Sequence, residues 1–231
     1  MSLKEEESHT SDSTFYEHQD KYSFVQRIIG QARQEMFDHF MEVARPTADT
    51  AVLDVGVTSY RRHDTNSFEK MYPYPAQITA LGTDDASFLE QDFPGLKFVK
   101  ANGLNMPFAD KQFDLATSWA TVEHVGSYDN QRKFVKEIMR VSRRCLITTP
   151  NRWYPIEFHT VLPLLHWLPP AQFRNILRLL KMESLASEEN LNLLGEKEFM
   201  DLLPPGVKCT TLHHRLFGSI SNLLFYLEDY N

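Results

Sequence analysis

The chain has 231 residues, of which 42% are hydrophobic, enough to build the core of one domain. Its formal net charge of −7 offers no general basic field for phosphate groups, so nucleic acid is not an expected partner. Two cysteines are too few for a disulfide framework, and the most apolar late segment, VLPLLHWLPP, is too short to span a bilayer.

Residues 1–22 are expected to form a polar tail. Their start, MSLKEEESHTSDS, carries acids where a secretory signal has basic residues and then an apolar stretch, so we expect a cytoplasmic location. From Ser23 onward, apolar residues recur at helical spacing until Pro46 interrupts the run. This pattern predicts an amphipathic helix over residues 23–45.

Strand-like runs then alternate with helical or turn segments. They lie at residues 51–55, 78–83, 97–100, 113–118 and 145–149. The alternation predicts an α/β fold whose sheet is mostly parallel, with helices on both faces. Weaker strand signals at residues 207–213 and 222–229 predict a late antiparallel addition. Residues 160–192 contain several prolines and then AQFRNILRLLKM, which predicts a helical insertion or lid within a single domain over residues 23–231.

Ligands of open parallel sheets bind beyond the carboxyl ends of the strands, so the residues that follow each strand are the candidates for a site. The first strand ends at Asp54 and Gly56, where a glycine lets backbone approach a ligand. Asp84 follows the second strand, and a carboxylate there can accept hydrogen bonds from both hydroxyls of a ribose. Asn102 follows the third strand and can both donate to and accept from an adenine edge.

The turn after Gly56 lacks the second glycine, two residues on, that dinucleotide pockets usually have. Thr58 occupies that position. The missing GxGxxG pattern argues against a nicotinamide-dependent oxidoreductase, which is therefore only an alternative interpretation.

Taken in order, the segments VLDVG, LGTD, NGLNMPF, FDLATSWATVEHV and KEIMRVSRRCLITTPN resemble the motifs of class I S-adenosylmethionine-dependent methyltransferases. The resemblance is to the small-molecule, type 11-like members and covers residues 50–151. It implies a Rossmann-like seven-stranded methyltransferase sheet with a late antiparallel strand. It also implies methyl transfer from S-adenosylmethionine to a small-molecule acceptor, with S-adenosylhomocysteine as product.

The resemblance assigns a role to each part of the pocket. It implies that the turn at Gly56 faces the methionine part of the cofactor, that Asp84 binds the ribose and that Ser118 lies beside the sulfonium. The expected cofactor-binding residues are Asp54, Gly56, Thr58, Asp84, Asp85, Asn102, Gly103, Leu104 and Ser118. Two features depart from the family pattern: the long link TSYRRHDTNSFEKMYPYPAQ with Thr58 in place of glycine, and Asn102 in place of the usual aspartate.

The segment after the fifth strand is expected on the acceptor side of the pocket. It offers flat apolar surface and a few polar groups, and the residues expected to bind the acceptor are Arg152, Trp153, Tyr154 and Glu157. His124 and His159 are candidates for a general base, although each also fits a structural role. Histidines and acids show no convincing ligand spacing, so no metal site is expected.

Two questions stay open at this point. The altered turn after Gly56 also fits a catalytically idle module that binds S-adenosylmethionine without transferring its methyl group. The PNRW and EFHT segments resemble those of uncharacterised bacterial members of the family, which implies a bacterial source but no particular acceptor. The sequence gives no indication of the oligomeric state.

Overall fold

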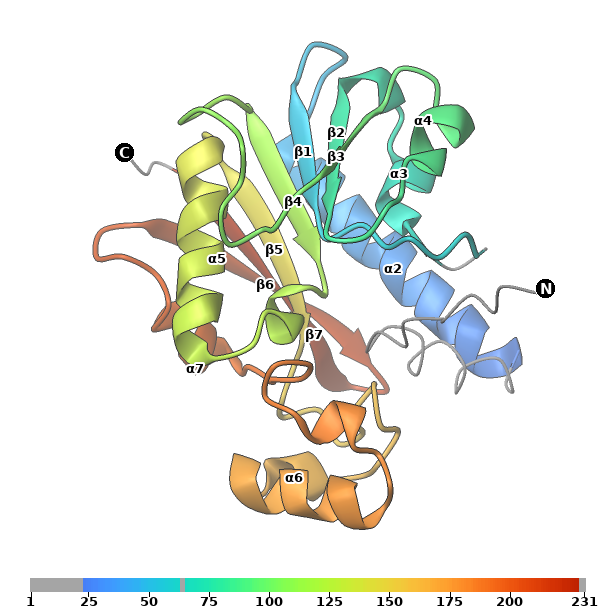
Figure 1. The fold of residues 1–231 in the computed structure, drawn as a ribbon, viewed down its shortest axis with the longest axis vertical. Helices are drawn as coiled ribbons and strands as arrows, with labels where there is room; N and C mark the ends of the chain where they lie inside the picture. The colour runs from blue at the N-terminus through green and yellow to red at the C-terminus, as the bar shows by residue number, and fades with distance from the viewer. Residues whose placement is uncertain (1–22, 63–64, 229–231) are drawn as a thin grey trace, which may run out of the picture.

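The computed structural model describes residues 23–62 and 65–228, so the expected polar tail at residues 1–22 lies outside the described residues. Its centre is a seven-stranded sheet of order β3-β2-β1-β4-β5-β7-β6 (Figure 1). The strands are β1 Val52–Val55, β2 Ile78–Gly82, β3 Lys97–Lys100, β4 Leu115–Trp119, β5 Cys145–Pro150, β6 Lys208–Leu216 and β7 Ser219–Glu228. β1 to β5 pair in parallel, and β7 runs antiparallel to both β5 and β6. The predicted mixed sheet is confirmed.

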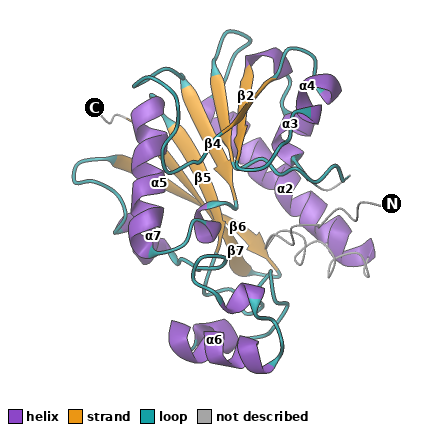
Figure 2. Ribbon diagram, viewed as in Figure 1, coloured by secondary structure: helices purple, strands orange, loops and turns teal. Residues whose placement is uncertain are grey.

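Helices cover both faces of this sheet (Figure 2). Helices α2, α3 and α4 lie on one side, and α5 and α7 lie on the other (Figure 1). Their bounds are α2 Ser23–Ala44, α3 Ser67–Met71, α4 Phe88–Asp92, α5 Tyr128–Val141, α6 Pro170–Leu179 and α7 Glu196–Met200. Four short 3-10 turns complete the described elements: η1 Pro75–Gln77, η2 Val122–His124, η3 Leu165–Trp167 and η4 Ser184–Ala186.

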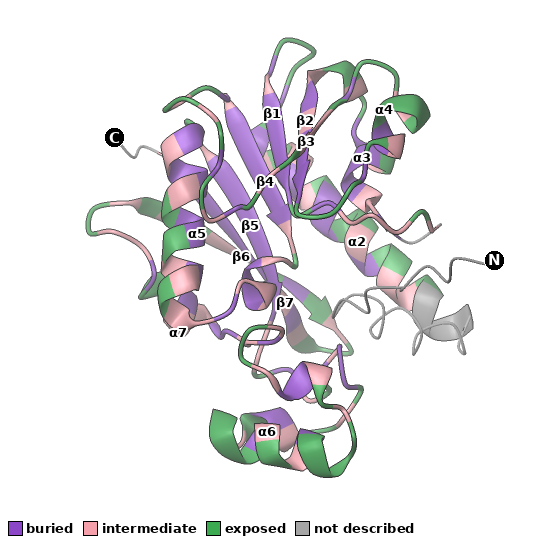
Figure 3. Cartoon of the chain, in the orientation of Figure 1, coloured by how far each residue is buried: buried purple, intermediate pink, exposed green. Residues whose placement is uncertain are grey.

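The central strands are buried on both faces, which explains their nearly continuous apolar sequence (Figure 3). Because successive side chains of a strand point to opposite faces, Leu53 joins the core under α5 while Val52 joins the core under α2 and α3. α5 contributes Phe134 and Ile138 to its core, and α2 contributes Phe40 to the other. The two cores hold the sheet between the helical layers.

An aromatic cluster fixes α3 against the sheet and against α2. Its members are Phe37, Phe40, Phe68, Tyr72 and Trp119. The rings of Phe40 and Phe68 meet edge to face with centroids 5.4 Å apart, and the rings of Phe68 and Trp119 stack at 6.1 Å. Such pairs add to the free energy gained by burial alone. Helix α3 is only five residues long, so this packing determines its position.

The segment expected as a helical insertion contains η3, α6 and η4 and lies beyond the sheet edge where β4 ends (Figure 1). It has a small core of its own, made by Phe173, Leu177, Leu185, Ala186 and Leu191. Within the described residues, no helix is long and apolar enough to cross a membrane.

Removing the central ring of the aromatic cluster should destabilise the fold. Phe40 is fully buried, so Phe40→Ala should lower the free energy of unfolding by about 3–5 kcal/mol. Denaturant titration measures this. Phe217→Ala is the matched control, because its side chain is 83% exposed and should contribute little. Equal losses in the two variants would contradict the central role of the cluster.

Candidate functional site

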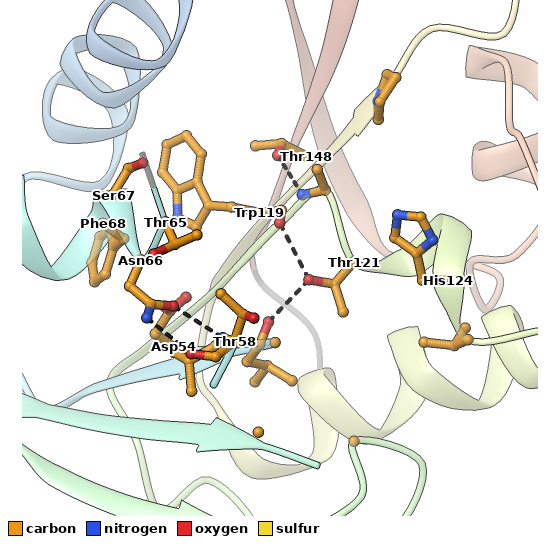
Figure 4. Close-up of a pocket in the computed structure, with 18 of the residues that line it drawn as sticks. Asp54, Thr58, Thr65, Asn66, Ser67, Phe68, Trp119, Thr121, His124 and Thr148 are labelled. Carbon is orange, nitrogen blue, oxygen red and sulfur yellow. Dashed lines mark hydrogen bonds between the residues drawn. The ribbon is translucent and has the colours of Figure 1, made fainter. Parts of the chain in front are cut away.

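A cavity of about 800 Å³ opens at the carboxyl ends of the parallel strands. The turn after β1, the start of α3 and the ends of β2 and β4 line it, as do η2 and short segments on either side of α6 (Figure 4). In Figure 4, Ser67 and Phe68 lie on one side of the pocket and His124 on the other. The cavity therefore collects side chains from most of the strand ends that the sequence indicates.

Gly56 is required by the geometry of the turn after β1. Its φ is +109°, a conformation that side chains disfavour, and a Cβ atom there would lie 2.1 Å from Thr121 Oγ1. The Gly56 N–H donates to the Leu81 carbonyl at 2.8 Å, so the turn also continues the contact between β1 and β2. The glycine thus lets the chain after β4 approach the chain after β1.

The Asn66 side chain fixes the turn at Thr58, the position where dinucleotide pockets usually have their second glycine. The backbone N–H of Thr58 donates to Asn66 Oδ1 at 3.0 Å, and Asn66 Nδ2 donates to the Thr58 carbonyl, also at 3.0 Å. Both residues line the cavity. Asn66 has a φ of 49°, which asparagine tolerates better than most residues, and it directly precedes α3. Sequence reasoning missed this residue.

Of the predicted site residues after β2 and β3, all but one line the cavity. Asp84 is exposed at the cavity wall, and Asn102, Gly103 and Leu104 line it as well. Asn102 Oδ1 accepts from the Leu104 N–H at 2.8 Å, which shapes this turn. Asp85 is not a lining residue; its Oδ1 accepts from the Ser87 N–H at 2.9 Å, just before α4.

Ser118 also lies away from the cavity. It is fully buried in β4, and its hydroxyl donates to the Val55 carbonyl at 2.9 Å. The strand continues one residue further than predicted, so Ser118 sits inside the sheet and not beyond its end. The lining residues from this part of the chain are Trp119, Ala120 and Thr121, and sequence reasoning did not single them out.

Two buried carboxyl groups, Asp54 and Glu69, meet at the floor of the cavity. Burial and then the charge of the adjacent Glu69 raise the pKa of Asp54 well above its usual range. Burial likewise raises the pKa of Glu69. Asp54 Oδ1 and both Glu69 oxygens have no hydrogen-bond partner in the part of the chain that the structure describes. A neutral carboxyl is therefore favoured here in the absence of a cation.

On the opposite side, the two candidate histidines contact each other. His124 Nε2 and His159 Nε2 are 3.1 Å apart, and both residues line the cavity. His159 Nδ1 contacts Glu157 Oε1 at 2.6 Å, and the backbone N–H groups of His159 and Thr160 donate to the same carboxylate. Burial alone would raise the pKa of Glu157, but His159 and these hydrogen bonds lower it to about 2. Glu157 is thus a buried anion with local partners.

The residues expected to bind the acceptor do not line the cavity: Arg152, Trp153, Tyr154 and Glu157. Arg152 Nη2 donates to the Leu168 carbonyl at 3.3 Å and so connects β5 to the insertion. Trp153 is half exposed beside Trp167, and the buried Tyr154 stacks on Phe158. From this segment it is Phe158 and His159 that reach the cavity.

The paired carboxyls predict a specific pH dependence of stability. A carboxyl whose pKa is higher in the folded than in the unfolded state binds extra protons when folded, so stability falls as the pH rises through that interval. Glu69→Gln removes one such group. The variant should match the wild type at low pH, where both carboxyls are protonated, and become the more stable of the two as the pH rises.

Denaturant titrations at a series of pH values measure the difference. Glu183→Gln is the control, because Glu183 is exposed and its substitution should show no trend. A difference between Glu69→Gln and wild type that stays constant with pH would show that Glu69 is ionised equally in both states.

Comparison with known proteins adds to this geometry. Residues 63–144 match the family model described as a methyltransferase domain. Over 86 residues the chain is 31% identical to the phthiotriol/phenolphthiotriol dimycocerosates methyltransferase of Mycobacterium tuberculosis, and the same-named protein of Mycobacterium bovis matches equally. These matches cover 36% of this chain and only 28% of the length of those relatives.

Solved structures share the fold over most of the chain. The 1,6-didemethyltoxoflavin N1-methyltransferase of Burkholderia thailandensis, with 1,6-didemethyltoxoflavin and S-adenosylhomocysteine bound, gives a TM-score of 0.57 at 16% identity, covering 95% of this chain and 85% of that one. Magnesium protoporphyrin IX methyltransferase of Synechocystis, with S-adenosylhomocysteine bound, gives 0.56 at 12% identity, covering 90% and 89%. Residues 63–144 thus match a methyltransferase domain, and around the cavity the chain has the fold of two methyltransferases solved with S-adenosylhomocysteine bound.

Proposed function

We propose that the protein transfers a methyl group from S-adenosylmethionine to a small-molecule acceptor. One observation carries the proposal: the turn at Gly56, the Asp84 carboxylate and the turn at Asn102 all line a single cavity at the carboxyl ends of β1, β2 and β3. That edge is where open parallel sheets bind nucleoside ligands.

The cofactor is proposed to lie along this row of strand ends. Its methionine part would face Gly56, Thr58 and the buried Asp54, and its ribose hydroxyls would donate to Asp84. Its adenine would lie in the turn that contains Asn102, Gly103 and Leu104. Thr121 replaces Ser118 as the residue proposed beside the sulfonium, because Thr121 lines the cavity next to Gly56.

Methyl transfer from a sulfonium requires little from the protein beyond orientation of the acceptor and the cofactor. The acceptor lone pair forms a bond to the methyl carbon, the carbon–sulfur bond breaks, and sulfur keeps the electron pair as S-adenosylhomocysteine departs. Alignment of the two reactants supplies most of the rate increase. An oxygen or nitrogen acceptor also loses a proton, for which His124 and His159 remain candidates. Proton uptake at either Nε2 requires their mutual contact to open.

The acceptor is proposed to enter from the side formed by Phe158, His159 and Asn190. The similar proteins give no single acceptor, because their names contain phthiotriol dimycocerosates, 1,6-didemethyltoxoflavin and magnesium protoporphyrin IX. A cytoplasmic, bacterial setting stays a prediction made from the sequence.

Calorimetric titration with S-adenosylmethionine, S-adenosylhomocysteine and NADH tests the proposal. We expect binding of the first two and none of the third. Binding of NADH alone would favour the oxidoreductase interpretation, and binding of none would remove cofactor binding altogether. If both sulfur nucleosides bind and no methyl transfer follows to a broad panel of small-molecule acceptors, the idle binding module becomes the better interpretation.

The ribose assignment predicts a contrast between two adjacent aspartates. Asp84→Ala should weaken S-adenosylhomocysteine binding by about 2–4 kcal/mol, because hydrogen bonds to a charged group contribute about 1.5–3 kcal/mol each and are not additive. Asp85→Ala should change it by less than about 1 kcal/mol, since Asp85 bonds Ser87 outside the cavity. Calorimetry on both folded variants measures this. Equal losses would mean that the ribose lies elsewhere.

A further inference from the structure

The contact between His124 and His159 is unusual because the ring hydrogens lie on the Nδ1 atoms and not on the two Nε2 atoms that face each other. His124 Nδ1 lies 2.6 Å from the carbonyl oxygen of Asn190, which can only accept, so this nitrogen carries the hydrogen. His159 Nδ1 lies 2.6 Å from a carboxylate oxygen of Glu157 and carries its hydrogen for the same reason. In neutral rings both Nε2 atoms are then acceptors, yet they face each other at 3.1 Å. Two lone pairs at this distance require a positive species between them.

Glu123 adds a third donor to the same place. Its ligand oxygen and the two imidazole nitrogens all lie within 4.8 Å of one another. The side chain is fully buried; Oε2 accepts from the Thr149 hydroxyl at 3.0 Å, while Oε1 has no hydrogen-bond partner among the described residues. A proton shared by the two histidines would leave that buried oxygen unsatisfied.

We propose that Glu123, His124 and His159 bind a divalent transition-metal ion of the Zn²⁺ type. Ligand atoms about 2.0–2.1 Å from a tetrahedral ion lie about 3.3 Å apart, close to the observed nitrogen separation. Each ligand also has the outer partner that such sites need: Asn190 O for His124, Glu157 for His159 and the Thr149 hydroxyl for Glu123. The ion would satisfy Glu123 and both lone pairs together.

Three protein ligands leave a fourth position open, and two of the ligands line the cavity. An oxygen or nitrogen atom of a pocket ligand fits that position. The metal site is independent of methyl transfer, because it rests on side chains that can be titrated without any acceptor. It does exclude one role: with both Nε2 atoms coordinated, neither histidine can accept a proton from the acceptor.

Metal titration of the 231-residue chain, after removal of bound ions by a chelator, tests the site. We expect Zn²⁺ to bind at one equivalent by calorimetry, and Co²⁺ to give the ligand-field absorption of a tetrahedral nitrogen and oxygen site. His124→Asn and His159→Asn should each weaken Zn²⁺ binding by more than the roughly 10- to 100-fold expected for Thr149→Val, which removes only an outer partner. His39→Asn, in a half-exposed histidine on α2, is the matched control and should bind as the wild type does.

Several outcomes would overturn the proposal: no stoichiometric binding to the wild type, or unchanged binding in both His124→Asn and His159→Asn, which would put the ion elsewhere. If a histidine variant fails to fold, Thr149→Val and Glu123→Gln test the site in its place, because each should also weaken Zn²⁺ binding. S-adenosylhomocysteine titration of the same samples is a separate measurement. If the wild type binds S-adenosylhomocysteine but no metal ion, this site alone is rejected.

Discussion

The order of the strands is the constraint on which the pocket depends. From β1 the chain moves outward to β2 and β3, then returns across β1 to β4 and β5, so the direction of winding reverses between β1 and β4. Helices that follow β1 cover one face of the sheet, and α5, which follows β4, covers the other. The loops that leave these two neighbouring strands therefore diverge and leave a crevice between them. Gly56 and Thr121 face each other across its base, where a Cβ on Gly56 would collide with the Thr121 side chain.

Within this crevice, one very short helix compensates for the missing glycine. The peptide of Thr58 is held by two hydrogen bonds from the Asn66 side chain, so a glycine is not needed to keep the turn open. Asn66 is in place because α3 follows it, and α3 is in place because Phe68 packs between Phe40 and Trp119. The same helix brings Glu69 next to Asp54. The packing of α3 on one face of the sheet thus positions Asn66, which shapes the turn, and Glu69, which adds a carboxyl group to the pocket.

The strands and helices follow from periodicity and could be predicted from the sequence. Contacts that depend on the direction of side chains could be predicted less well. Alternation of strands and helices predicted the sheet, and strand ends predicted that Gly56, Asp84 and Asn102 share one edge. Ser118 was misplaced because β4 ends one residue later than its pattern indicates, at Trp119. The contact of His124 with His159 spans 35 positions, and no spacing rule along the chain could reveal it. Arg152 is on the predicted edge, but its side chain turns toward Leu168, which only the packing of the insertion decides.

The two sides of the pocket deal with buried negative charge in different ways. At the floor, burial and mutual repulsion raise the pKa of Asp54, so protonation relieves the cost of placing it beside Glu69. Across the pocket, Glu157 stays ionised because His159 and two backbone N–H groups surround it. The first arrangement can change its protonation when a cationic ligand arrives, whereas the second is already satisfied and fixes the direction of the His159 ring. The carboxyl pair at the floor therefore lies where the positive charge of a bound sulfonium or ammonium group would favour its ionised form. Opposite it, the contact with Glu157 fixes the ring of His159, which lines the cavity.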